Sequence, residues 1–195
     1  MNEPKIKGNI FSFNTAIIGS VNNDADFIKN IEQKGYYNLN LNSLSYNSNP
    51  DLELKTLLNL NDYTFSNKLQ CIILSNVVNL VKSGHKKLIL NNIITFVDTS
   101  LKCVLLEFLK KNEVTYINIT SDMEEVLYSE YLVVIYQDKV ALEGNTLEVL
   151  NEEKLLTRMG FKLPFIIDIS IQLKYYGLID KIYTTKEDLV SVLWK

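Results

Sequence analysis

The stretch KKLILNNIITFVD, from Lys86 to Asp98, decides the fold class. Its apolar run Leu88–Leu90 has the length and composition of a buried strand, and it ends abruptly in two amides, Asn91 and Asn92. Parallel α/β proteins bind their ligands at the carboxyl ends of strands, and their enzymes usually keep acidic side chains there. Two uncharged amides at this place therefore need an explanation.

Composition limits the classes of protein to which the chain can belong. It has 195 residues, 47% hydrophobic and 22% charged, which is typical of a globular protein with one main domain. A net charge of -3 gives no overall attraction to nucleic acid. Two cysteines (Cys71, Cys103) and one histidine (His85) cannot build a common structural zinc site, and so few cysteines fit a reducing cytoplasm. No stretch predicts a signal peptide or a transmembrane span.

Strand and helix patterns alternate along most of the chain. Strands are predicted over residues 9–20, 36–46, 87–91 and 114–120, followed by a hairpin over 131–144. Helices are predicted near residues 26–34 and 66–82, from 101 onward, and over 121–129. This order favours an α/β fold with a mainly parallel sheet. After Gly144 only amphipathic helical patterns follow, and Thr185 is the expected cap of the last one.

The stretch AIIGSVNNDADFI, residues 16–28, lies between the first strand and the first helix, where a phosphate-binding loop would be found. Such a loop needs several glycines, a lysine and a hydroxyl residue. Gly19 is the one glycine here, and Asp24 and Asp26 would repel a phosphate. The simpler interpretation is an ordinary capped turn. As a vestigial phosphate loop, the stretch would offer Gly19, Ser20, Asn22 and Asn23.

The segment SDMEEVLYS, residues 121–129, carries three acids in one turn: Asp122, Glu124 and Glu125. Three carboxylates could converge on a metal ion. A solvated first turn, stabilised by the helix dipole, is the simpler explanation, so no metal is expected.

Three segments taken in order carry a family resemblance: LILNNIITFVD, VTYINITSDMEEVLYSEYLVVIYQDKVALEGNTLEVL and LTRMGFKLPFIIDISIQLKYYGL. The series resembles the ATP-binding-cassette (ABC) ATPases, and most of all those of energy-coupling-factor importers. In that family one strand ends LILDEPTSMLD, a later one ends ITHDMEE, a hairpin ends in EG, and a helical tail contains a GL-x-x-P turn. The resemblance runs from about Leu88 to Leu193.

The resemblance implies a fold and a domain division. The expected fold is α/β, with a P-loop-NTPase-like, mainly parallel sheet flanked by helices and a C-terminal helical appendage. A truncated ABC-ATPase-like core is expected over residues 1–145, and the helical subdomain over 146–195.

The resemblance also assigns roles to single positions. Asn91 stands where the family has the Walker B aspartate that holds magnesium, and Asn92 stands where it has the glutamate that activates water. Ser121 replaces the switch histidine, whereas Asp98 matches the D-loop aspartate and is kept. In the phosphate loop, Ala25 replaces the lysine and Asp26 the hydroxyl residue. The stretch FSNKLQ, residues 65–70, lies about where the glycine-containing signature belongs.

These replacements predict a protein without catalysis. An amide is not a general base near neutral pH and is a weak magnesium ligand beside a carboxylate. We therefore expect a catalytically inactive partner or regulatory subunit, such as one of an importer. No cofactor is expected, with ATP and magnesium disfavoured. The partner would be a second copy, an intact ABC ATPase or a membrane coupling protein. Contact residues would be Asp98, Asp122, Glu124 and Glu125, and the location cytoplasmic or peripheral at the inner face of the membrane.

Two alternatives stay open. The first is a sensor that binds a nucleotide or anion without hydrolysing it, supported by Gly19 and the helix N-terminus that follows. The second is an ATP-binding importer subunit with residual ATPase activity, using Lys29 and Asp98. No residue in the matching stretch replaces the catalytic carboxylate, which weighs against the second alternative.

Overall fold

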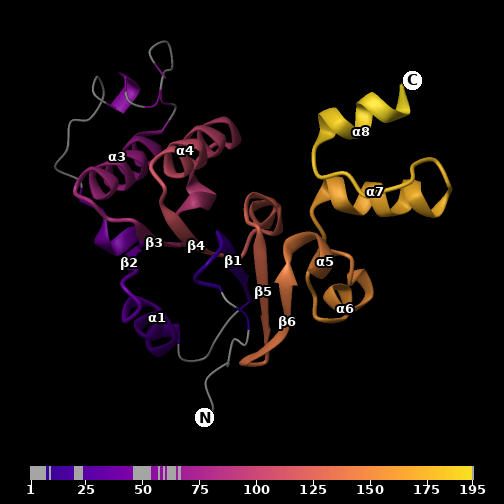
Figure 1. Cartoon of the computed structure of the whole chain (residues 1–195), viewed down its shortest axis with the longest axis horizontal. Helices are drawn as coiled ribbons and strands as arrows, with labels where there is room; N and C mark the ends of the chain where they lie inside the picture. Colours follow the sequence, from indigo (N-terminus) through magenta and orange to yellow (C-terminus); the bar gives the residue numbers. More distant parts are fainter. Residues whose placement is uncertain are drawn as a thin grey trace.

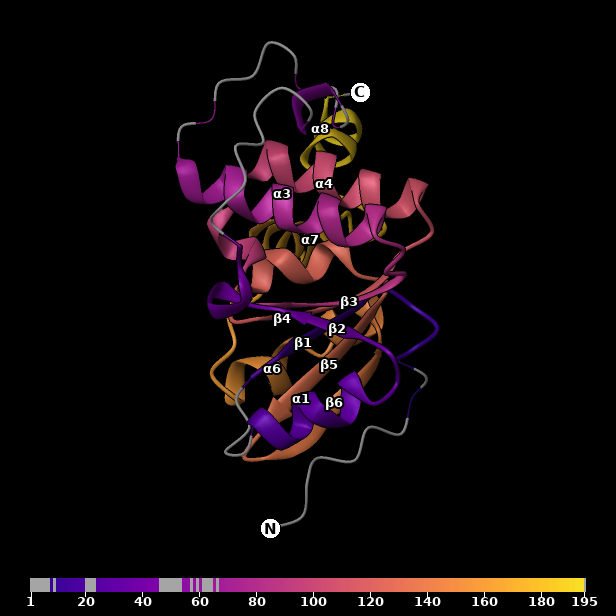
Figure 2. The same cartoon turned by 90° about the vertical axis from the view of Figure 1, so that its left-hand side faces the viewer.

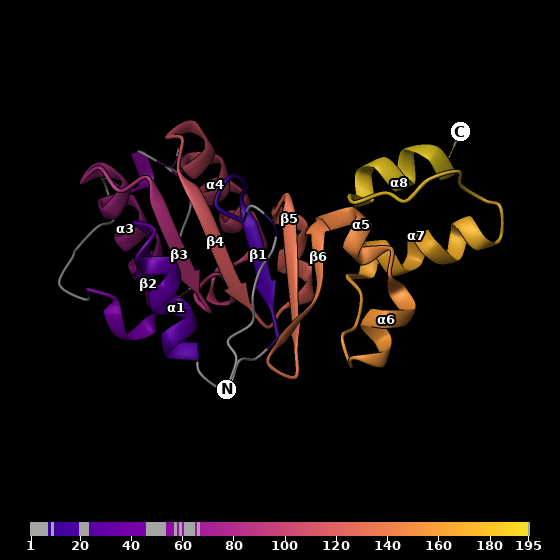
Figure 3. The ribbon, with the colours of Figure 1, turned by 60° about the horizontal axis from the view of Figure 1, so that its bottom comes forward.

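A six-stranded sheet organises the protein. The computed structural model describes residues 8, 10–19, 24–45, 54–56, 58, 60, 65 and 67–194. The strand order is β2-β3-β4-β1-β5-β6 (Figure 3). The first five strands run parallel and β6 is antiparallel to β5, so the predicted mainly parallel α/β sheet is confirmed. Their bounds are β1 Thr15–Ile18, β2 Tyr37–Leu39, β3 Lys87–Asn91, β4 Thr115–Thr120, β5 Tyr131–Tyr136 and β6 Lys139–Asn145.

Helices cover both faces of this sheet. Helices α3 (Lys68–Lys82) and α4 (Thr99–Lys111) lie over one face, and α1 (Asp24–Glu32) lies on the other (Figure 2). Beyond β6 the chain forms a helical tail (Figure 1). The tail consists of α5 Thr146–Leu150, α6 Glu153–Arg158, α7 Phe165–Tyr175 and α8 Lys186–Leu193. The described residues also form three 3₁₀ turns: η1 Leu41–Ser43, η2 Ile94–Phe96 and η3 Met123–Tyr128.

The alternation of side chains along the strands divides the core between the two faces. Leu88 and Leu90 of β3 pack with the helices α3 and α4, whereas Ile89 between them packs with Phe27 and Ile31 of α1. A further cluster joins β1 and β5 to the tail, which therefore has part of its core in common with the sheet. Its members include Ala16, Leu132, Leu150, Leu156 and Ile167. The domain boundary at residue 145 stays a prediction.

The strand predicted over residues 36–46 is wrong beyond Leu39. The Asn40 side chain accepts hydrogen bonds from the backbone amides of Asn42 and Ser43, and the Ser43 hydroxyl accepts one from the Asn40 amide. This capping box turns the chain into η1, because the polar side chains offer the backbone an alternative to strand pairing. Alternating leucines and asparagines alone did not reveal this competition.

Two other predicted elements also differ from the structure. The strand predicted over residues 9–20 is limited to Thr15–Ile18, since the Thr15 hydroxyl donates to the carbonyls of Ile10 and Phe13 and holds residues 10–13 in a turn. The helix predicted over 121–129 is the 3₁₀ turn η3. The other predicted strands and helices that fall on described residues are present, with bounds shifted by at most two residues, and Thr185 caps α8 as expected.

Gly19 ends β1 in a position where a side chain does not fit. Its φ is 100°, and a Cβ atom there would overlap the backbone carbonyl of Ile135 on the neighbouring strand β5. A backbone carbonyl inside a sheet cannot move aside as a flexible side chain can. Close packing against Ile135 thus explains the glycine at position 19 without a role in phosphate binding.

We predict that Gly19→Ala destabilises the protein more than Gly35→Ala. Gly35 also has a positive φ, 85°, but a Cβ there would meet no atom within 4 Å. Gly35→Ala should therefore cost only the conformational strain, about 1–2 kcal/mol. Gly19→Ala should add an overpacking cost of about 1–3 kcal/mol. Urea unfolding measures both values, and equal costs would contradict the close approach of Gly19 to Ile135.

Candidate functional site

A hollow lies at the carboxyl edge of the sheet, where the ends of β1, β3 and β4 meet. Its volume is about 260 Å³. Gly19 follows β1, Asn91 ends β3, Asn92 comes directly after it, and Ser121 follows β4. All four line the hollow. Sequence reasoning picked these four residues from three separate segments. The parallel pairing of β4 with both β1 and β3 brings them together.

The described lining of this hollow carries no charged side chain. Beside the four residues named above, the walls are mostly apolar and are contributed by the strands and by α1. They comprise Ile17, Phe27, Ile28, Ile119, Thr120 and Ile135. None of these residues has an ammonium or guanidinium group to pair with a phosphate, or a carboxylate to hold its magnesium ion.

The two asparagines at the end of β3 are hydrogen-bonded to each other and to the sheet. The side-chain Nδ2 of Asn92 donates to Asn91 Oδ1 at 3.2 Å. The backbone N–H of Asn92 donates to the Ile119 carbonyl at 2.8 Å. Asn92 has a φ of 51°, a left-handed conformation that asparagine tolerates better than most residues. The backbone thus gives a structural reason for an asparagine at position 92.

The phosphate-loop predictions are only partly within reach of the structure. Ser20, Asn22 and Asn23 lie outside the described residues. Asp26 is exposed at the start of α1 and pairs weakly with Lys29, at 3.8 Å. Lys29 is not among the residues that line the hollow.

The predicted contact residues occupy different environments. Asp98 is exposed at the N-cap position of α4. Asp122 is partly buried and caps η3 by accepting a hydrogen bond from the Glu124 amide at 2.9 Å. Glu124 Oε1 accepts a hydrogen bond from the amide of Phe165, at 2.7 Å, and so caps the first turn of α7 in the tail. Two of the acids thus stabilise local structure in this chain.

Glu125 does not fit the role of a surface contact, because only 1% of its side chain is exposed. Its Oε1 lies 2.9 Å from Lys102 Nζ, and Lys102 itself is 10% exposed on α4. Its Oε2 accepts a hydrogen bond from Asn118 Nδ2 at 3.1 Å. An acid held in this way is an internal brace between η3, α4 and β4.

The environment of Glu125 sets its protonation. Burial raises the pKa of this carboxyl group, but hydrogen bonds from Lys102, Thr120 and Asn118 and the charge of Lys102 outweigh burial and hold the pKa below its ordinary value. The carboxylate is therefore charged at neutral pH. Asn118 Oδ1, by contrast, has no hydrogen-bond partner among the described residues.

Sequence reasoning missed Lys102 and Asn118, although both left a signal. Lys102 follows Leu101 and lies three residues before Leu105, on the apolar side of α4. Asn118 alternates with Tyr116 and Thr120 along a buried strand. A lysine on an apolar helix stripe and an amide inside a strand both indicate a buried polar partner.

Within the described residues, no three histidine, cysteine, aspartate or glutamate side chains lie close enough to hold a metal ion. None of the helices in that same part of the chain is long and apolar enough to cross a bilayer.

The parallel sheet, with loops from β1, β3 and β4 around one hollow, defines an open α/β fold of the kind that binds ligands at the carboxyl ends of its strands. Solved structures agree with this fold. CbiO1 from Clostridium perfringens, described as part of the ABC transporter complex CbiONQ, gives a TM-score of 0.50 at 18% identity, over 77% of this chain and 84% of that one. A bacterial Atm1-family ABC exporter with ATP bound gives 0.54 at 13% identity, over 75% of this chain and 36% of that one.

Sequence comparison narrows the class. The energy-coupling-factor transporter ATP-binding protein EcfA of Malacoplasma penetrans is 30% identical over 95 residues, 49% of this chain and 33% of that protein. EcfA1 of Geobacillus kaustophilus is 30% identical over 86 residues, 44% of this chain and 31% of that protein. Over about half of its length the chain is thus similar in sequence to the energy-coupling-factor ATPases. It spans about a third of the length of these curated relatives, and no protein-family model matches it.

We predict that Lys102→Met destabilises the protein by about 3–5 kcal/mol, because it leaves the Glu125 carboxylate buried without its cation. Lys111→Met is the matched control. Lys111 pairs with Glu107 at 3.0 Å, but both side chains are 65% exposed, so its loss should cost about 0–1 kcal/mol. Chemical denaturation at neutral pH measures both values.

The pH dependence tests the same pair in a second way. In the unchanged protein the folded pKa of Glu125 is below the unfolded value of about 4.3, so its stabilisation is present above that pH and is lost as the pH falls through the folded pKa. Without Lys102, burial should raise the folded pKa, and the variant should lose stability as the pH rises above about 4.3. Parallel stability profiles for the two proteins would rule out this pairing.

Proposed function

We propose that this protein is a non-hydrolysing, ABC-ATPase-like subunit that acts by binding another protein. The observation that carries this proposal is the described lining of the hollow at the sheet edge. There, Asn91, Asn92 and Ser121 come together without a charged neighbour. This is the edge at which a nucleotide would react in an α/β ATPase.

The chemistry of phosphoryl transfer supports the proposal. Catalysis of this reaction depends on positioning the phosphates and on neutralising their charge with a lysine and a metal ion. A general base or a water-orienting group is also needed. The amides of Asn91 and Asn92 provide neither a strong metal ligand nor a base, and they are hydrogen-bonded to each other. Apolar side chains such as Phe27 and Ile28 form much of the remaining wall.

The helical tail supports a role in binding a partner. Large apolar and aromatic side chains are unusually exposed there, and monomeric proteins rarely leave so many in one region. They are Phe165, Tyr175, Tyr176, Leu178, Val190 and Trp194, each more than half exposed. Aromatic side chains of this kind are enriched in protein interfaces.

The curated relatives suggest which partner to expect. They are named as ATP-binding proteins of energy-coupling-factor transporters, and CbiO1 is described as part of a transporter complex. We therefore propose an intact ATPase of such an importer, or its membrane coupling protein, as the partner, and a second copy of this chain as the alternative. Binding of this kind would place the protein at the inner face of the membrane.

We predict that neither the unchanged protein nor the Asn91→Asp/Asn92→Glu variant hydrolyses Mg-ATP above background. The variant restores both acids, but the described lining would still hold no cation for the phosphates. Phosphate release measures the rate. Because glutamate at the left-handed position 92 adds strain, circular dichroism is needed to check that the variant is folded. Turnover by either protein would refute the inactive assignment.

We predict that an intact energy-coupling-factor ATPase forms a complex with this protein through the tail. Tyr175→Ser/Trp194→Ser should weaken binding by about tenfold or more, because exposed aromatic anchors carry much of the energy of an interface. Tyr136→Ser is the control, since Tyr136 is 38% exposed but lies on β5 outside the tail. Titration calorimetry measures the affinity. Equal weakening by the control, or the absence of any complex, would contradict the proposal.

A sensor that binds a nucleotide or anion without hydrolysis is the second candidate. The hollow itself favours it, because Gly19 and the start of α1 lie at the edge of the sheet beside it. A ligand at 100 times its dissociation constant would stabilise the protein by about 2.7 kcal/mol, which is easily seen as a rise in melting temperature. Such a rise with Mg-ATP, ADP or phosphate would favour the sensor.

A further inference from the structure

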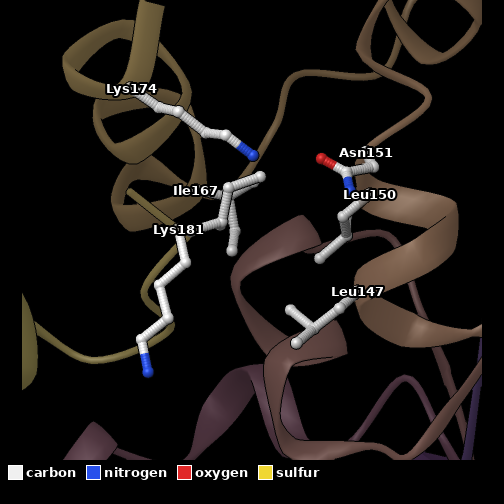
Figure 4. A pocket seen from close by; sticks show the side chains of 7 residues that line it. Leu147, Leu150, Asn151, Ile167, Lys174 and Lys181 are labelled. Carbon is white, nitrogen blue, oxygen red and sulfur yellow. The ribbon is translucent and has the colours of Figure 1, made fainter. Parts of the chain in front are cut away.

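A second hollow, of about 260 Å³, lies in the helical tail, away from the sheet edge. Its walls are aliphatic: Leu147 and Leu150 come from α5, Ile167 comes from α7, and Ile182 comes from the segment before α8 (Figure 4). Leu150 and Ile167 are fully buried, whereas Leu147 is 43% exposed at the rim. The hollow therefore has a buried, apolar floor, and its mouth is open to solvent beside Leu147.

Two polar groups face each other across this mouth. Figure 4 shows the Lys174 ammonium on one side and the Asn151 carboxamide on the other, with Ile167 and Leu150 between them. Neither side chain makes a hydrogen bond or an ion pair with the part of the chain that the structure describes. An apolar cavity with a few convergent polar groups is the usual form of a small-molecule site.

Helix geometry produces this arrangement. Ile167 and Lys174 are seven residues apart, two turns along one face of α7, so the apolar floor and the cation belong to the same side of the helix. Leu147, Leu150 and Asn151 are spaced by three and four residues, and Asn151 is the C-cap of α5. The polar group thus lies at the end of the helix that contributes two of the walls.

We propose that this hollow binds a small aliphatic carboxylate. Its hydrocarbon body would cover the accessible surface of Leu147 and Ile182, above the buried Leu150 and Ile167. Its carboxylate would accept hydrogen bonds from Lys174 Nζ and from the amide group of Asn151, which can turn to present Nδ2. A bare phosphate would leave the aliphatic walls uncovered, and a neutral aliphatic molecule would make no charge-assisted hydrogen bond with the exposed Lys174 ammonium.

Lys181 adds positive potential but no direct contact. In Figure 4 its ammonium points away from the hollow, and it lies 5.3 Å from the centre of the Tyr183 ring. The proposed site lies in the same tail as the proposed partner surface, but it uses none of the exposed aromatic side chains assigned to that surface.

Octanoate is the probe for the test, titrated into the full chain and followed by NMR chemical shifts and calorimetry. We expect saturable binding at one site, with Lys174→Gln weakening it by about tenfold or more, since a hydrogen bond to a charged group is lost. Lys154→Gln is the matched control, because Lys154 is an exposed lysine of α6 outside the lining and carries the same charge. It should bind octanoate as the unchanged protein does.

Two further comparisons make the result decisive. Leu147→Trp should abolish binding by filling the mouth, and because Leu147 is 43% exposed this change should leave the fold intact. Octan-1-ol, which has the same body without the charge, should bind at least tenfold more weakly. The proposal is overturned if octanoate does not saturate, if octan-1-ol binds equally well, or if Lys174→Gln and Lys154→Gln behave alike.

Discussion

The ion pair between Lys102 and Glu125 is the constraint on which the arrangement of the protein depends. The Lys102 ammonium and the Glu125 carboxylate are almost completely shielded from water. They lie between two hydrophobic clusters, one packed under α3 and α4 and one that joins β1 and β5 to the tail. Desolvating both groups is costly, so the pair is tolerated only in a geometry in which each charge is satisfied. That requirement fixes the turn η3 against α4, and with it the position of Ser121 at the sheet edge.

The same turn also reaches the tail. Glu124, one residue before the buried acid, caps α7 through the Phe165 amide. A single short segment, residues 121–125, therefore touches the sheet edge, the brace on α4 and the first helix turn of the tail. Of the four acids that the family resemblance assigns to a partner surface, three serve here to hold this chain together: Asp122, Glu124 and Glu125. The exposed part of the tail is the surface that we propose for a partner.

How much the sequence predicts depends on whether the deciding interaction is local. The apolar runs at Leu88–Leu90 and Ile117–Ile119 predict buried strands, and parallel pairing then predicts that Asn91, Asn92 and Ser121 converge, as they do. The partner of Glu125 is 23 residues distant on a helix, and no local pattern distinguishes this acid from its exposed neighbour Glu124. The turn at Asn40 was missed for a related reason, because a side chain competes there with strand pairing.

The two outermost strands of the sheet, β2 and β6, have a consequence for how the protein can assemble. On one side the sheet ends in β2, which pairs over only three residues; on the other it ends in β6, which carries Lys139 and Glu143 and leads directly into α5. Short or charged edge strands are poor templates for adding a strand from another molecule. Growth of the sheet from chain to chain is thus disfavoured, and helix surfaces are left as the places where a second protein can attach without extending the sheet.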